Sequence, residues 1–75
     1  MEEKIVEIIE KYDEAGDVDE CVNEVKNYLE TRKVTDYKIN TKHVYDSPGL
    51  DIYDIGVAWN DSEGLHLVTY GLWNY

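Results

Sequence analysis

Carboxylates are the most frequent side chains in this sequence that could carry a function. The chain has 17 acidic and seven basic residues, for a net charge of −10. Ten of the acids but only two of the bases lie within residues 1–24. So negative a field repels the phosphates of nucleic acids and anionic membrane surfaces. The charge therefore predicts no direct binding to nucleic acid or membrane, and favours electrostatic binding to a basic protein.

The acids near the N-terminus recur at helical spacing. Glu3, Glu7, Glu10 and Glu14 are three or four residues apart, so their carboxylates repeat about every 5–6 Å along a helix axis. One DNA strand presents a phosphate about every 3.4 Å. Two helices, or two copies of the chain, would place neighbouring rows of carboxylates side by side, and their combined spacing would be closer to that of the phosphates. Such an array suits a basic groove that ordinarily holds phosphates, and would displace DNA by competition.

We define the acidic surface as the nine predicted partner-binding residues Glu3, Glu7, Glu10, Asp13, Glu14, Asp17, Asp19, Glu20 and Glu24. The candidates to extend it are Asp46, Asp51, Asp54, Asp61 and Glu63. A solvated helix face, with pairs such as Glu7 and Lys11, explains the same ridge without a partner. Ten acids in 24 residues repel one another, however, and this repulsion destabilises the folded chain. Binding of a basic partner would relieve it, which favours a role in binding.

No convincing catalytic set accompanies the acids. Cys21 falls on the apolar face of a predicted helix, where a buried and inert thiol is expected. His43 and His66 fall on different predicted strands and lack the local spacing of zinc ligands. The glycines do not form a phosphate-binding loop. We therefore predict that the protein is not an enzyme and has no cofactor and no metal site.

Two helices are predicted to position the acids. In residues 2–14 the apolar side chains follow a helical period, which predicts an amphipathic helix ending near Gly16. Asp17, with Glu20 three residues later, predicts the N-cap of a second helix. The apolar face of that helix is formed by Val18, Cys21, Val22, Val25, Tyr28 and Leu29.

The period changes to two after Lys33, which predicts strands at residues 37–45, 50–59 and 65–75. The segments 46–49 and 60–64 are rich in turn residues. The sequence thus predicts a single α+β domain over residues 1–75, with two N-terminal helices packed on a three-stranded antiparallel meander (ααβββ).

The last strand carries large apolar side chains on both faces, whereas two helices cover only one face of the sheet. The exposed face predicts a homodimer, formed face to face or by pairing of the final strands. The predicted interface residues are Tyr70, Leu72 and Trp73.

The sequence lacks the features of exported and membrane proteins. No apolar run approaches the roughly 20 residues needed to span a bilayer, and the opening residues do not resemble a secretory signal. A single cysteine is also untypical of a small secreted domain. We therefore expect a cytoplasmic protein.

The acidic opening MEEKIVEIIEKYDEAGDVDE and the aromatic ending LVTYGLWNY resemble those of small acidic phage-encoded host-takeover proteins that mimic DNA. In style the chain is similar to phage inhibitors of the histone-like nucleoid protein HU, and to acidic anti-restriction and anti-CRISPR proteins. This resemblance implies a homodimer in the host cytoplasm. Its acidic surface would fill the DNA-binding site of a basic nucleoid-associated, restriction or CRISPR protein.

Two other functions fit the same sequence. An acidic immunity or antitoxin-like protein would cap a basic toxin, and a protein-interaction module would bind through its aromatic sheet face. Salt dependence separates the DNA mimic and the immunity protein from the sheet-face module. Electrostatic binding weakens steeply as ionic strength rises, whereas binding through the sheet face persists.

Overall fold

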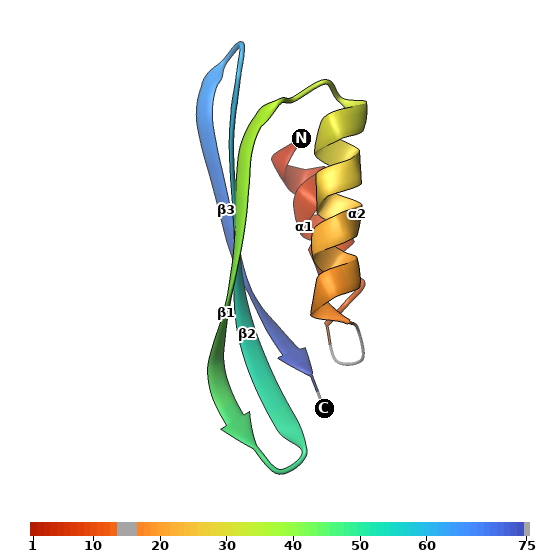
Figure 1. Ribbon diagram of the computed structural model, residues 1–75, viewed down its shortest axis with the longest axis vertical. Coiled ribbons are helices and arrows are strands. Elements are labelled where there is room, and N and C mark those ends of the chain that lie inside the picture. Colours follow the sequence, from red (N-terminus) through yellow and green to blue (C-terminus); the bar gives the residue numbers. More distant parts are fainter. Residues whose placement is uncertain (14–16, 75) are drawn as a thin grey trace.

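Two helices precede three strands in the computed structural model, which describes residues 1–13 and 17–74. The helices are α1 (Glu2–Glu10) and α2 (Val18–Thr31), and the strands are β1 (Asp36–Ser47), β2 (Leu50–Asp61) and β3 (Gly64–Asn74). The strands form an antiparallel meander in the order β1-β2-β3, and both helices lie on one side of it (Figure 1). The predicted ααβββ fold of the α+β class is confirmed.

The amphipathic helix α1 is shorter than predicted. Its buried side chains are Ile5, Ile8 and Ile9, which follow the predicted helical period, but the helix ends at Glu10. The N–H groups of Tyr12 and Asp13 donate to carbonyls only three residues back, and this tightens the chain into a turn. Glu14 and the predicted cap at Gly16 lie outside the described residues.

The helix α2 begins where the capping pattern predicted. The Asp17 carboxylate accepts hydrogen bonds from the backbone N–H groups of Asp19, at 2.8 Å, and Glu20, at 3.4 Å. These donors would otherwise be unsatisfied at the helix start. The buried face of α2 consists of Cys21, Val25 and Leu29.

The C-terminus of α2 is closed by a Schellman motif. Lys33 takes a positive φ of 63°, and its N–H donates to the Glu30 carbonyl. The N–H of Val34 donates to the Leu29 carbonyl at 3.0 Å. This pattern satisfies helix-end carbonyls and redirects the chain toward β1.

The core lies between the helices and one face of the sheet. Cross-strand register places Ile55 opposite Tyr70, and Val57 opposite Val68. The sheet contributes these side chains, together with Trp59 and Leu72, to the cluster formed with α1 and α2.

The same register places the three residues of the predicted dimer interface. Leu72 is only 2% exposed and Tyr70 is partly buried against the core, so both point toward the helices. Trp73 occupies the alternate face and is 46% exposed. The predicted interface stays a prediction, but the helices cover the even-numbered face of β3, so Leu72 has little exposed surface to offer a second copy.

A β-bulge interrupts the predicted alternation of β1. His43 pairs with Tyr53, whereas Tyr45 pairs with Ile52, so the register shifts by one residue at Val44. A bulge rotates the following side chains relative to the regular pleat. The β1–β2 pairing therefore has a shifted register next to its turn, whereas the β2–β3 pairing keeps a regular register up to its turn.

Neither α1 nor α2, the helices of the described residues, is long and apolar enough to cross a membrane.

Candidate functional site

The exposed acids of α1 form the most regular part of the acidic surface. Glu3, Glu7 and Glu10 are all exposed, and they lie on the helix opposite the buried isoleucines. Glu7 Oε2 lies 3.7 Å from Lys4 Nζ, with both side chains more than half exposed. A surface pair of this kind contributes little free energy, so Glu7 can exchange that contact for a basic group of a partner. We call Glu3, Glu7 and Glu10 the α1 row.

Asp19 and Glu20 add two exposed carboxylates in the first turn of α2. Negative charge at a helix N-terminus interacts favourably with the helix dipole. These two residues therefore have a local stabilising role as well as a place on the exposed acidic surface.

Three members of the acidic surface hold the fold together. Asp17 caps α2, as described above. Asp13 is partly buried, and its carboxylate accepts the backbone N–H of Trp73 at 2.8 Å. Glu24 accepts hydrogen bonds from Lys11 and, at 2.6 Å, from the Tyr12 hydroxyl. These contacts tie α1 to α2 and the helical layer to β3, so a partner could use these carboxylates only by breaking them.

The bonds to Glu24 also shift two pKa values. The hydrogen bond from Lys11, followed by the one from Tyr12, lowers the pKa of Glu24. The hydrogen bond to Glu24, together with burial and the Glu24 charge, raises the pKa of Tyr12 to about 12. The pairing of Lys11 with Glu24 replaces the predicted pairing of Lys11 with Glu7.

A groove of about 520 Å³ runs between α1 and α2. Lys4 and Lys11 line it together with Glu7 and Glu24, and its floor includes Ile8. The exposed α1 row therefore borders a groove of mixed charge rather than a continuous sheet of carboxylates.

The helix-free face of the sheet carries a second exposed feature. Leu65 is 78% exposed and Leu67 is 66% exposed, and Trp73 lies on the same face of β3. A shallow hollow of about 340 Å³ crosses the middle of the sheet at Gly56 and Gly71. Leu65 and Leu67 form a small exposed apolar group, whereas Thr69 and Gly71 separate them from Trp73 along β3. Exposed apolar groups of this kind are candidate sites of association.

The five acids predicted to extend the acidic surface do not form one array. Asp61 accepts the N–H of Glu63 at 2.8 Å and lies 3.1 Å from His66, so it stabilises the turn between β2 and β3. Asp46 and Asp51 instead gather beside His43 at the other turn. Nothing in the sequence marks the bulge that forms this cluster, so the cluster was not predicted.

The remaining candidate reactive side chains are the single cysteine and the two histidines. Cys21 is completely buried, as predicted, and burial raises the pKa of its thiol to about 11. The reactive thiolate is therefore scarce at neutral pH. His43 and His66 lie at opposite ends of the sheet, opposite Tyr53 and Trp59 respectively.

Comparison with protein-family models, curated proteins and solved structures finds no match to this chain.

Proposed function

We propose that this protein is a non-enzymatic DNA mimic that occupies the DNA-binding surface of a basic protein and displaces DNA from it. The partner would be a nucleoid-associated protein or a component of a restriction or CRISPR system. The observation that carries the proposal is the exposed row of Glu3, Glu7 and Glu10 on a short, well-anchored helix.

The physical basis is competition between two polyanions for the same cationic groove. A basic surface that binds DNA gains free energy from releasing counterions condensed on the phosphates. Carboxylates held on a folded helix have already lost part of their conformational freedom, so they bind with a smaller ordering cost than a flexible acidic tail. The net charge of −10 also accelerates the encounter with a cationic partner.

In this proposal the working form is a homodimer that buries the helix-free face. Leu65, Leu67 and Trp73 are the exposed apolar residues on β3 that a second copy would cover. Association through this face leaves both helical layers outside, so each dimer presents two α1 rows.

The test is capture of basic proteins from a bacterial lysate, followed by competition with DNA for the captured partner. We expect the triple variant Glu3→Lys, Glu7→Lys and Glu10→Lys to weaken partner binding by about tenfold or more, equivalent to about 1.4 kcal/mol. Wild-type binding should fall steeply between low and high salt.

The matched control is the triple variant Glu30→Lys, Asp46→Lys and Glu63→Lys, which makes the same change in net charge at exposed positions outside α1 and outside the helix-free face. Equal losses from the two triple variants would show that only total charge matters, and would remove α1 from the site.

The double variant Leu65→Ser and Leu67→Ser examines the other exposed surface. We expect it to lower the mass in sedimentation equilibrium toward that of a monomer. If it abolishes partner capture in a salt-independent manner while the α1 variant binds normally, the protein is a sheet-face interaction module instead.

A further inference from the structure

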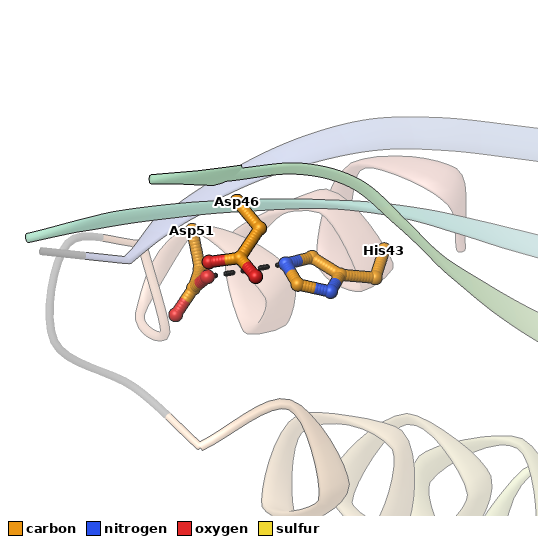
Figure 2. Close-up of side chains that lie close together, drawn as sticks. All are labelled: His43, Asp46 and Asp51. Carbon is orange, nitrogen blue, oxygen red and sulfur yellow. Dashed lines mark hydrogen bonds and ion pairs between the residues drawn. The ribbon is translucent and has the colours of Figure 1, made fainter. Parts of the chain in front are cut away.

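The turn between β1 and β2 gathers three side chains of metal-ligating type. His43, Asp46 and Asp51 project from the same side of the hairpin and point toward one another (Figure 2). One ligand atom from each residue lies within 4.8 Å of the other two. His43 Nε2 and Asp51 Oδ1 are 3.1 Å apart.

The bulge in β1 creates this arrangement. In a regular strand His43 and Asp46, three residues apart, would point to opposite faces. The extra residue Val44 shifts the register, so Asp46 comes to face the same side as His43 and pairs directly with Asp51. Bulges often re-aim a side chain in this way beside functional sites.

An aromatic stack orients the histidine ring. The rings of His43 and Tyr53 have centroids 4.5 Å apart and an interplanar angle of 15°. Tyr53 is the cross-strand partner of His43 on β2. The stack defines the plane of the imidazole and leaves Nε2 directed at the carboxylates, as a supporting residue does for a metal ligand.

The two carboxylates lack a fixed positive partner. Asp46 and Asp51 are directly opposite on neighbouring strands, a position in which like charges destabilise a sheet. Among the described residues, the only ion-pair partner of either carboxylate is the His43 ring, which is charged only when protonated. A bound divalent cation would neutralise both carboxylates and remove this repulsion.

We propose that His43, Asp46 and Asp51 bind one divalent transition-metal ion, with Zn²⁺ as the preferred ion. At metal–ligand distances of about 2.0–2.2 Å and tetrahedral angles, neighbouring ligand atoms are about 3.3–3.6 Å apart. The 3.1 Å between His43 Nε2 and Asp51 Oδ1 is close to this spacing, and the Asp46 carboxylate lies within 4.8 Å of both. The imidazole ligand disfavours Mg²⁺ and Ca²⁺, which prefer oxygen. The side chains are at the surface, so water completes the coordination.

Titration of the full chain with ZnCl₂ in a calorimeter tests the proposal. We expect one Zn²⁺ per chain, with binding at least about tenfold weaker in His43→Gln, Asp46→Asn and Asp51→Asn. The matched control is Asp54→Asn, which makes the same charge change on the opposite face of β2 and should bind Zn²⁺ as the wild type does. Excess MgCl₂ should not displace the Zn²⁺.

Either of two results would overturn the metal site. One is the absence of saturable Zn²⁺ binding by the wild type. The other is an equal loss of affinity in Asp54→Asn and Asp51→Asn, which would indicate general attraction to an acidic protein. Neither result bears on the α1 row, so the metal site and the DNA-mimic proposal fail independently.

Discussion

The two histidines lie at opposite ends of the sheet, and both have aspartate neighbours and an aromatic ring beneath them. At the β2–β3 end, His66 stacks on Trp59 with ring centroids 5.2 Å apart. Its Nδ1 lies 3.0 Å from Glu2 Oε1 and its Nε2 lies 3.1 Å from Asp61 Oδ1. The ring therefore bridges two carboxylates from different elements and joins α1 to the turn.

At the β1–β2 end, His43 directs one ring nitrogen toward Asp51, with Asp46 beside it. Here one ligand atom from each of the three residues lies within 4.8 Å of the other two, whereas the two carboxylates around His66 lie at different ring nitrogens. The end with His66 lies against α1, while the turn after His43 projects past the helices (Figure 1). The comparison indicates that similar residue types serve structure where they bridge elements, and suit ion binding where they converge.

The largest difference between the two ends should appear when the ring under each histidine is removed. Trp59 is only 1% exposed, so Trp59→Ala should lower the free energy of unfolding by about 3–5 kcal/mol. Tyr53 is partly buried, and Tyr53→Ala should cost about 1–2 kcal/mol, mainly from the lost stack and reduced burial. Urea denaturation followed by circular dichroism measures both. Equal losses would contradict the view that only the His66 end is built into the core.

A smaller difference should appear in the pH dependence of stability. Hydrogen bonds to Glu2 and then Asp61 raise the pKa of His66 above its ordinary 6.5. The protonated ring is favoured in the folded state, so its contribution is fully present below about pH 6.5 and is lost as pH rises through the raised pKa. His66→Gln should therefore destabilise the protein more at pH 6 than at pH 8. A pH-independent difference from wild type in urea denaturation would argue against this bridge.

The smallest effects should have opposite signs at the two turns. In EDTA, Asp46→Asn should stabilise the protein by about 0.2–1 kcal/mol, because it removes the repulsion with Asp51. Asp61→Asn should destabilise it by about 1 kcal/mol, because it weakens the bonds to Glu63 and His66. The same concentration of Zn²⁺ should raise the melting temperature of the wild type more than that of Asp46→Asn. Stabilisation by Asp61→Asn would remove the structural distinction between the two turns.

The order of elements could be predicted because each has a strong local signal. The helical period of the isoleucines, the Asp17 cap and the change to a period of two after Lys33 all act within a few residues. The exposure of the α1 row followed from the same pattern. These features depend on neighbours along the chain, which a single sequence displays directly.

Features that depend on pairing between strands could not be predicted in this way. Both faces of β3 carry large apolar groups, so alternation alone did not indicate that Leu72 would be covered and Trp73 exposed. No glycine or turn residue marks the bulge at Val44 in the sequence, so the placement of His43 and Asp46 on the same face was not predicted. The hydrogen bonds of Asp13 with Trp73 and of Glu24 with Tyr12 likewise join residues that are far apart in the sequence.

The contact between Asp13 and Trp73 bears on how two copies of the chain can associate. β3 is an outer strand, and exposed backbone donors along such a strand are where a foreign strand would add. The amide of Trp73 already donates to the protein's own carboxylate. A second chain that paired with this edge of β3 would have to displace that carboxylate and leave Asp13 without the N–H that donates to it. The carboxylate therefore hinders sheet extension at this end of β3, and the proposed dimer would form by stacking of the helix-free faces.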